Sequence, residues 1–289
     1  IAPTRRAGGT RSGSSVRGSC SAEVARIAVA ATAPFGADVL ARLAERHEIA
    51  ALLTRPDAPR GRGRRVTPSP AKQVAVELGL PVLAPERPEP GLPLDAPVVV
   101  VCAYGALIPE ALLAERRWLN VHPSLLPRWR GAAPVERAIM AGDEETGVTI
   151  HETVKELDAG PIAAVERFPI GELDAGGVFE RAAEIAARLL DAVLEDPDPR
   201  FTPQAAEAVT YADKLTPADR VLDPGRPAEE LVRVVRALSP HIGARAELHG
   251  RPVTIWRARV GDDGGLEPLE IQPDGGRRMP YPDWVRGLR

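Results

Sequence analysis

The hydrophobic positions of this chain fall into short, almost wholly apolar runs that are separated by longer amphipathic stretches. The runs at 26–31, 49–53 and 97–102 have the length and composition of buried strands, whereas 37–46 and 70–78 have the spacing of amphipathic helices. Strands that are apolar on both faces and alternate with helices are typical of a parallel sheet covered on both sides. The pattern therefore predicts an α/β fold whose ligands bind beyond the carboxyl ends of the strands.

The pattern changes in the last third of the chain. The segment 195–203 is acidic and holds three prolines, so it cannot continue a helix and marks a boundary. Beyond it, 229–238 has the spacing of a helix, and 251–258 alternates like a strand with one exposed face. We therefore predict a larger α/β domain at 26–195, a linker at 196–205 and a smaller domain at 206–289.

The first 25 residues stand apart from the rest of the chain. They are rich in arginine, serine and glycine, and they lack the apolar stretch of a secretory signal. Organellar transit peptides share this composition, but a disordered leader, or a start assigned too far upstream, is the simpler explanation. We therefore expect residues 1–25 to lie outside the fold.

Composition narrows the class of protein. With 289 residues, of which 44% are hydrophobic and 27% charged, the chain has globular values and can bury a sizeable core. No run approaches the roughly 18 apolar residues of a membrane span, so no membrane partner is expected. Cys20 lies in a polar tail and Cys102 in an apolar run, so a disulfide framework is not expected and a reducing cytoplasm is the predicted location.

The net charge of −3 excludes a uniformly basic nucleic-acid binder, although not a local basic patch. Such a patch lies at 54–65, where five arginines against one aspartate give a net charge of +4. Two prolines and two glycines predict a loop there. A charged run is more often a solvated surface, but local positive charge on an acidic protein is also the expected footprint of phosphate contact.

The candidate chemistry begins with Asn120 and His122, at the end of a predicted strand. Side chains alternate along an extended segment, so these two point to one face while Val121 points away. An amide beside an imidazole can polarise a carbonyl and hold the oxyanion that develops there. Pro123 and Pro127 end the strand and stiffen the following loop, which places the pair at a rim of the sheet.

A second motif lies downstream. The segment 146–151 alternates like a strand, and 157–162 has the composition of a tight loop in which Asp158 can cap backbone amides or face a cavity. On its own, Asp158 would more commonly be a turn-forming residue. We assign His151 no catalytic role, because a polar residue on a half-buried strand is sufficient explanation for it.

These motifs together resemble the 10-formyltetrahydrofolate-dependent formyltransferase family. The resemblance is carried by Asn120, His122 and the run 124–127, followed by the Leu-Asp-Ala-Gly motif at 157–160. Within that family, 124–134 is similar to the tRNA formyltransferases, and recognisable similarity covers about 26–260. The resemblance implies a Rossmann-like formyltransferase domain with a mainly parallel sheet, followed by a smaller OB-like β-barrel that helps to hold tRNA.

The resemblance also implies that Asn120, His122 and Asp158 form the active site. They would transfer a formyl group from 10-formyltetrahydrofolate, the donor cosubstrate, to the α-amine of methionine on initiator tRNA. Asn120 would donate to the oxyanion of a tetrahedral intermediate, and a protonated His122 would do the same or give a proton to the departing N10. Asp158 would either favour the charged imidazole or accept the proton of the amine, and the sequence leaves these roles open.

Two sets of binding residues follow from the same resemblance. Folate contacts are implied for the first motif and for the loop after the third strand, at Ser124, Leu125, Leu126, Pro127, Tyr104, Gly105 and Ile108. The arginine-rich stretch matches an insertion with a Gly-Arg-Gly core that enters the acceptor-stem groove of tRNA. Arg62 is its central arginine, and further tRNA contacts are implied for Arg60, Arg64 and Arg65.

The chain departs from the family pattern at three places. Ala31 stands where a glycine is usual, Ala159 replaces a more common threonine, and 260–272 is shorter than the usual barrel requires. The barrel is therefore expected to be either incomplete or trimmed at one hairpin. None of these changes removes a proposed reacting group.

Other functions have to be weighed against this one. A glycinamide ribonucleotide formyltransferase would share the three site residues without needing the arginine stretch, and a folate-dependent hydrolase or sugar-nucleotide formyltransferase would change the acceptor site. An inactive RNA-binding module would leave the three residues unexplained. A nicotinamide dehydrogenase is disfavoured because 30–34 lacks the glycine-rich turn. We expect a monomer. We expect no metal, because the histidines are scattered and the cysteines have no partner at ligand spacing.

Overall fold

The computed structural model of the chain describes residues 24–60 and 65–288. The predicted leader lies outside the described residues except for Val24 and Ala25, and the centre of the arginine-rich stretch, 61–64, lies outside them as well. No helix within the described ranges is long and apolar enough to cross a membrane.

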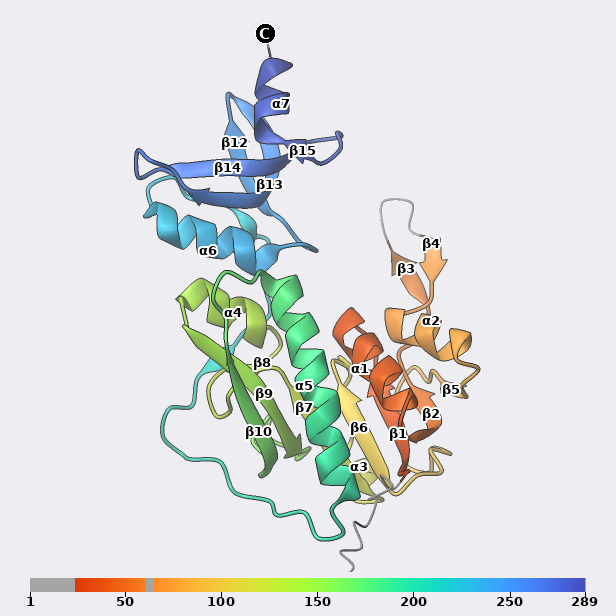
Figure 1. Cartoon of the computed structure of the whole chain (residues 1–289). Coiled ribbons are helices and arrows are strands. Elements are labelled where there is room, and N and C mark those ends of the chain that lie inside the picture. The colour runs from red at the N-terminus through yellow and green to blue at the C-terminus, as the bar shows by residue number, and fades with distance from the viewer. Residues whose placement is uncertain (1–23, 61–64, 289) are drawn as a thin grey trace, which may run out of the picture.

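A seven-stranded sheet forms the larger part of the molecule (Figure 1), in the order β10-β9-β7-β6-β1-β2-β5. Its strands are β1 (Arg26–Ala31), β2 (Glu48–Leu53), β5 (Val82–Leu83), β6 (Val98–Cys102), β7 (Arg117–His122), β9 (Glu145–Glu152) and β10 (Ile162–Pro169). The strands from β7 to β5 pair in parallel, and β9 and β10 add an antiparallel hairpin at one edge. The prediction of a mainly parallel sheet in an α/β fold is confirmed.

Four helices cover one face of this sheet, and one short helix lies on the other. The helices of this part are α1 (Pro34–Ala44), α2 (Pro70–Glu77), α3 (Glu110–Leu113), α4 (Pro134–Ala141) and α5 (Ala175–Glu195). Leu40 of α1 and Ile185 of α5 pack with Leu119 and Val121 of β7 in one core. The opposite face carries Trp118, which packs with residues of α3 and of the irregular segments around it. Side chains alternate along β7, so Leu119 and Val121 lie on the face covered by most of the helices, and the even-numbered residues lie on the opposite face.

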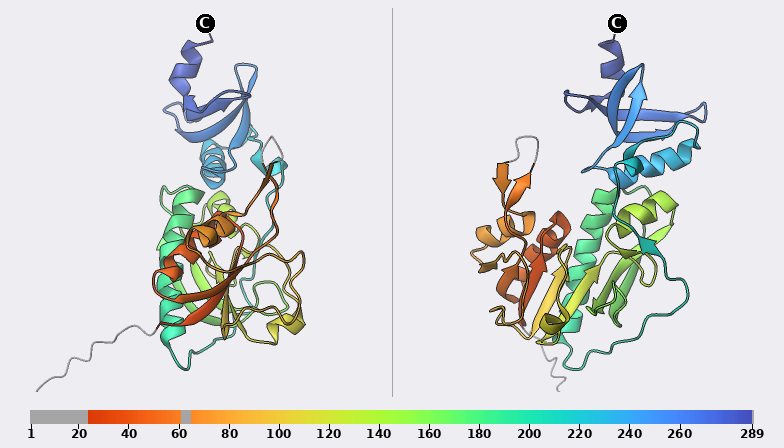
Figure 2. Two further views of the ribbon diagram at one scale, coloured as in Figure 1. Left: turned by 90° about the vertical axis from the view of Figure 1, so that its right-hand side faces the viewer. Right: turned by 180° about the vertical axis from the view of Figure 1, so that it is seen from behind.

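The C-terminal part is a smaller antiparallel sheet in the order β12-β13-β14-β15. Its elements are η1 (Ala218–Arg220), α6 (Ala228–Leu238), β12 (Ala244–Leu248), β13 (Arg251–Val260), β14 (Leu266–Pro273), β15 (Met279–Pro280) and α7 (Tyr281–Arg286). Helix α6 lies between this sheet and the larger part, as Figures 1 and 2 show from three directions. Among the described residues β12 and β15 do not pair, so the sheet is open and the incomplete form of the expected barrel is the one observed.

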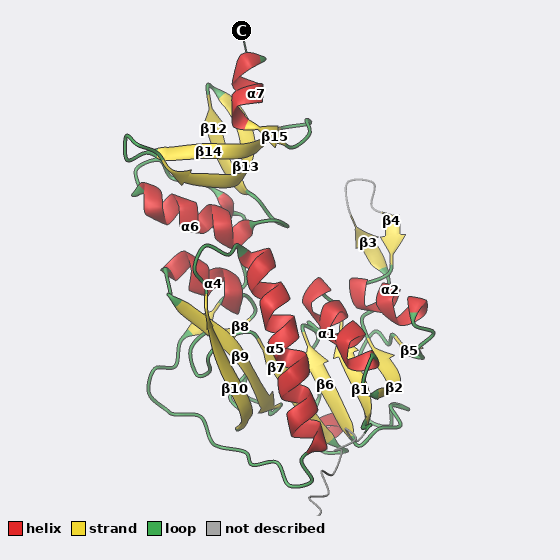
Figure 3. Cartoon of the chain, viewed as in Figure 1, coloured by secondary structure: helices red, strands yellow, loops and turns green. Residues whose placement is uncertain are grey.

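The connection between α5 and the smaller sheet is long and mostly irregular (Figure 3). It returns along the larger sheet, where Thr202 exchanges backbone hydrogen bonds with Ile162, and β11 (Tyr211–Ala212) pairs with β8 (Arg130–Gly131). The boundary predicted at 196–205 thus falls in a segment that contacts the larger part. The domain limits stay a prediction.

A buried hydrogen bond ties the turn after α1 to α5 at the amino ends of the strands. His47 Nδ1 accepts a hydrogen bond from the backbone of Ala25 (3.3 Å), so Nε2 carries the proton and donates to Asp191 Oδ1 (2.9 Å). Asp191→Ala would leave that N–H unpaired in a buried site, and we expect it to lower the free energy of unfolding by about 1–3 kcal/mol. Urea unfolding measures this change.

The control is Asp38→Ala, which removes a half-buried pair with Arg42 and should cost no more than about 1 kcal/mol. Equal losses of unfolding free energy in the two variants would show that the buried contact stabilises the protein no more than the Asp38–Arg42 pair does.

Candidate active site

The even-numbered face of β7 carries the two polar residues singled out from the sequence. Asn120 lies within the strand, opposite Val101 of β6 and His151 of β9, and His122 is the last residue of β7. The His122 side chain is 5% exposed, so it is nearly enclosed. Both side chains lie beside the carboxyl end of β6, which agrees with the expected position of the site in a parallel sheet.

The structure brings Asp158 to this pair. Its Oδ1 accepts a hydrogen bond from Asn120 Nδ2 (3.1 Å), and its Oδ2 accepts one from the backbone N–H of Gly131 (2.8 Å). His122 Nδ1 lies 3.7 Å from Oδ2, which is close enough for charge attraction but longer than a hydrogen bond. Asn120, His122 and Asp158 therefore form one cluster.

The Asp158 loop is held tightly against β9. Asp158 itself has a left-handed backbone conformation (φ +48°), which a residue other than glycine rarely adopts. Gly160 lies so close to the strand that an added Cβ would sit 1.8 Å from the carbonyl oxygen of Glu152. This close approach explains the glycine of the Leu-Asp-Ala-Gly motif.

His151 belongs to the same cluster, and the interpretation of it as a merely structural strand residue overlooked this. Its Nδ1 donates to the carbonyl of Glu152 (2.8 Å), so Nε2 is the accepting nitrogen, and Asn120 Nδ2 donates to it (3.2 Å). Burial lowers the pKa of the His151 imidazole to about 4, although the Asp158 carboxylate opposes the shift. At neutral pH His151 is therefore an uncharged acceptor.

The orientation of the Asn120 amide follows from these neighbours. A carboxylate and an unprotonated imidazole nitrogen are both acceptors, so the amide nitrogen must face them and both of its hydrogens are engaged. An oxyanion bound at Asn120 would therefore have to share one of these hydrogens or replace Asp158 or His151 as its acceptor.

The orientation of His122 is set by the loop that follows it. Its Nε2 lies 2.8 Å from the carbonyl oxygen of Trp129, and since a carbonyl only accepts, Nε2 carries a proton. The Nδ1 edge is left facing Asp158. Because that separation is too long for a hydrogen bond, Nδ1 is the imidazole atom available to a reacting group.

The expected folate residues divide into buried and accessible ones. Ser124 is fully buried and donates to the carbonyl of Arg128 (2.7 Å), so its hydroxyl is already used within the loop. Tyr104 is also buried, and this burial raises the pKa of its hydroxyl. In the first motif Leu126 is buried, while Leu125 and Pro127 are half-buried. In the other loop Gly105 is exposed and Ile108 half-buried. Folate contacts at these positions stay a prediction.

The arginine-rich stretch is a hairpin where the sequence predicted a loop. Strands β3 (Ala58–Arg60) and β4 (Arg65–Thr67) pair in antiparallel fashion, with Arg60 opposite Arg65. The hairpin projects from the same end of the large sheet as the C-terminal part (Figures 1 and 2). Arg62 and Arg64, two of the expected tRNA contacts, lie outside the described residues.

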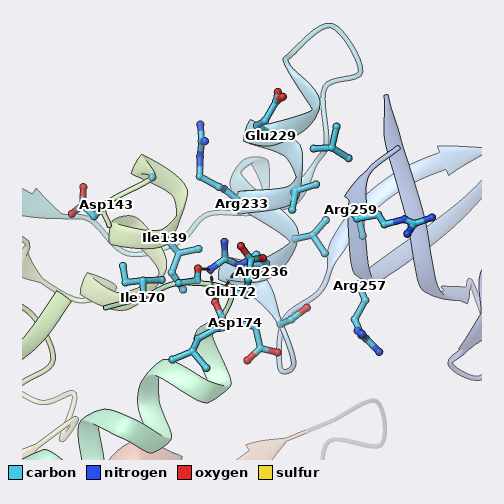
Figure 4. A pocket seen from close by; sticks show the side chains of 18 of the residues that line it. Ile139, Asp143, Ile170, Glu172, Asp174, Glu229, Arg233, Arg236, Arg257 and Arg259 are labelled. Carbon is cyan, nitrogen blue, oxygen red and sulfur yellow. Dashed lines mark hydrogen bonds between the residues drawn. The ribbon is translucent and has the colours of Figure 1, made fainter. Parts of the chain in front are cut away.

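A cavity of about 920 Å³ lies away from this cluster, between the large sheet and the C-terminal part (Figure 4). Arginines of α6 and β13 line it, among them Arg236, which donates to the carbonyls of Gly171 and Leu173. Carboxylates lie among them, so the lining has no strong positive field: Asp143, Glu144, Glu172, Asp174 and Glu229. None of the three catalytic candidates lines it. Within the described ranges, no group of three side chains is placed to hold a metal ion.

The low pKa of His151 predicts a specific pH dependence of stability. Above pH 6.5 the imidazole is neutral in both the folded and the unfolded chain. As the pH falls from 6.5 towards 4, the unfolded chain binds the proton and the folded protein does not, so stability is lost in that window. We expect this group to cost up to about 3 kcal/mol by pH 4.

Urea unfolding from pH 7 to pH 4 would test this, by comparing the unchanged protein with His151→Gln, which cannot bind the proton. The slope of stability against pH should be smaller in the variant, whereas His241→Gln, at an exposed position, should leave it unchanged. A slope in His151→Gln as steep as in the unchanged protein would contradict the assignment of a neutral, buried His151.

Known proteins with similar sequences include the family that the sequence motifs resemble. The formyl transferase family matches residues 25–194, and the formyl transferase C-terminal domain matches 214–268. The chain is 40% identical over 290 residues to methionyl-tRNA formyltransferase of Paracoccus denitrificans, covering 91% of this chain and 97% of that protein.

Two solved structures share the fold. Methionyl-tRNA formyltransferase from Clostridium thermocellum superposes with a TM-score of 0.60 at 14% identity, covering 86% of this chain and 99% of that one. HypX from Aquifex aeolicus in complex with tetrahydrofolic acid gives 0.64 at 18% identity, covering 90% of this chain and 46% of that one. This chain thus spans about half the length of HypX.

Proposed function

The chain belongs to the formyl transferase family, and from this we propose that it transfers a formyl group from 10-formyltetrahydrofolate to the α-amine of methionine on initiator tRNA. The product, formylmethionyl-tRNA, serves the initiation of translation. The observation that carries the proposal is the convergence of Asn120, His122 and Asp158 on one face of β7, in a chain so similar to a methionyl-tRNA formyltransferase over almost its whole length. A monomer in the cytoplasm remains the prediction for its state and location.

The reaction replaces one carbon–nitrogen bond by another. The neutral α-amine attacks the formyl carbon, giving a tetrahedral intermediate with negative charge on oxygen, and collapse of that intermediate breaks the bond to N10. The amine loses one proton and N10 gains one, so the site has to stabilise the oxyanion and move a proton.

The geometry indicates how the site divides these two tasks. Asn120 brings amide hydrogens to the oxyanion. His122 accepts the proton of the attacking amine at Nδ1, since its Nε2 already carries the proton that faces the Trp129 carbonyl, and the ring can then give the proton gained at Nδ1 to N10. Asp158, 3.7 Å from Nδ1, balances the charge of the imidazolium that results. His122 and Asp158 are thus the pair through which the proton shed by the amine can reach N10.

The acceptor is assigned from the arginine-rich hairpin. We expect Arg62→Ala to lower kcat/KM for charged initiator tRNA by about tenfold or more, the usual effect of losing one hydrogen bond between charged groups. The dissociation constant for the folate should not change, because none of the expected folate contacts lies in the arginine-rich stretch. Steady-state kinetics with varied tRNA, together with folate titration, would measure both.

Arg87→Ala is the matched control, since Arg87 is an exposed arginine of a different loop. Unchanged tRNA kinetics in Arg62→Ala would remove the hairpin from the acceptor site.

A direct test of the proposed function compares acceptors under the same conditions. The purified protein and 10-formyltetrahydrofolate are incubated with charged initiator tRNA, with glycinamide ribonucleotide, or with neither. The proposal predicts formylation of the tRNA alone. Formylation of glycinamide ribonucleotide in its place, or hydrolysis of the donor without any acceptor, would support one of the rival functions.

A further inference from the structure

The segment 202–212, which we call the connecting segment, runs along the catalytic cluster on its way to the C-terminal part. At one end Thr202 exchanges two backbone hydrogen bonds with Ile162, each 2.8 Å long. At the other end β11 pairs with β8, and the Ala212 carbonyl accepts from Ala132 (2.8 Å). Between these anchors, two of its side chains reach the backbones that carry the catalytic candidates.

The first of these side chains is Gln204. Its Nε2 donates to the carbonyls of Asp158 (2.7 Å) and Gly160 (2.8 Å), and its Oε1 accepts from Arg130 Nε (3.1 Å) and Nη2 (2.6 Å). The orientation of the amide is determined, since carbonyls only accept and a guanidinium only donates. Gln204 thus holds the backbone of Asp158 in its left-handed conformation, and that conformation directs the carboxylate towards Asn120 and His122.

The second is Thr210. Its Oγ accepts a hydrogen bond from the backbone N–H of Trp129 (2.9 Å), and its carbonyl accepts one from Arg130 (2.9 Å). Trp129 also has a left-handed backbone (φ +64°), and its carbonyl is the one that accepts from His122 Nε2. Thr210 therefore holds the residue whose carbonyl determines which nitrogen of His122 carries the proton.

We propose that Gln204 and Thr210 are positioning residues of the formyl-transfer site, which act through Asp158 and Trp129 without touching substrate. The sheet supplies Asn120 and His122, while the connecting segment maintains the two left-handed backbones that orient the Asp158 carboxylate and the His122 ring. This inference rests on the proposed function of that cluster. Small displacements of reacting groups are costly, because a misplacement of about 1 Å can reduce a rate by about 10²-fold.

Kinetics of isosteric variants would test the proposal. Thr210→Val keeps the shape of the side chain but removes the acceptor for Trp129, and Thr210→Ser restores it. Gln204→Glu keeps an acceptor for Arg130 but removes the donors to Asp158 and Gly160. Thr202→Val is the matched control, because Thr202 is exposed and is joined to the sheet through its backbone alone.

We expect kcat to fall by about 10²-fold in Thr210→Val and in Gln204→Glu, with the KM for tRNA and for the folate little changed. Thr210→Ser and Thr202→Val should turn over like the unchanged protein. The proposal is overturned if kcat in both isosteric variants stays within about twofold of the unchanged protein. It is equally overturned if the loss is confined to KM, or matches a loss of folded protein in urea unfolding.

A second measurement does not depend on turnover. Nitrogen-15 NMR of the imidazole rings should show His122 protonated at Nε2 in the unchanged protein, with that resonance displaced in Thr210→Val and restored in Thr210→Ser. The His47 resonance, from the distant pair with Asp191, should stay in place. A His122 resonance that does not move in Thr210→Val would overturn the proposal. If the resonance moves but the unchanged protein cannot formylate tRNA, the proposed function is refuted and the positioning role of Thr210 stands.

Discussion

Replacing Asn120 by alanine is expected to lower the turnover number for formyl transfer by about 10²–10³-fold, the usual cost of removing one oxyanion donor. The Asn120 side-chain amide is the group that we expect to donate a hydrogen bond to the oxyanion. It also donates to both His151 and Asp158, and so connects them. Its loss therefore removes the donor and loosens the two groups that it connects. Steady-state turnover at saturating folate and charged tRNA would measure the effect.

Lys155→Ala is the control for this substitution, because Lys155 is an exposed residue of the nearby Asp158 loop. Binding of tRNA should persist in Asn120→Ala, since the amide is not part of the proposed tRNA surface. Turnover like that of the unchanged protein would exclude Asn120 from the chemistry.

Asp158→Asn should have a still larger effect, a loss of about 10³–10⁴-fold in turnover. That is the scale seen when the carboxylate that orients a catalytic imidazole is neutralised without a change of shape. The carboxylate accepts from Asn120 and Gly131 and faces His122. An amide in its place would turn an N–H₂ group towards one of these donors and could not balance a charged imidazole.

The matched control for this change is Glu156→Gln, which neutralises an exposed carboxylate two residues earlier in the same loop. Turnover in Asp158→Asn should fall with the KM for both substrates nearly retained. A loss expressed in KM alone would assign Asp158 to substrate binding, and equal activity in the two variants would remove it from the site.

The predicted elements are most accurate where the local pattern is unambiguous. The apolar run at 26–31 coincides with β1, and the helix predicted at 70–78 begins at the same residue as α2, where Ser69 caps it. By contrast, none of the predicted elements covers α5, the longest helix. Its first turn holds Gly176 and Gly177, which are poor helix formers, although the apolar residues further along share one face. Its stability comes from burial of that face against α1 and the sheet.

The catalytic candidates show the same limit. Asn120, His122 and Asp158 could be found because two short motifs contain them. His151 could not, since its role depends on the antiparallel register that sets it opposite Asn120. Gln204 lies 46 residues after the carbonyl that it holds. Contacts of this kind depend on the register in which strands pair and on where a distant segment packs. Neither can be inferred from the residues immediately around one position in a single sequence.

A single-turnover measurement of formyl transfer to charged initiator tRNA, with the protein in excess over both substrates, tests whether the Asn120 cluster performs this reaction. We expect the unchanged protein to form formylmethionyl-tRNA, and Asn120→Ala to do so about 10²–10³-fold more slowly while still binding the tRNA. Formation of the product at equal rates by both proteins, or none by the unchanged protein while glycinamide ribonucleotide is formylated, would contradict this expectation.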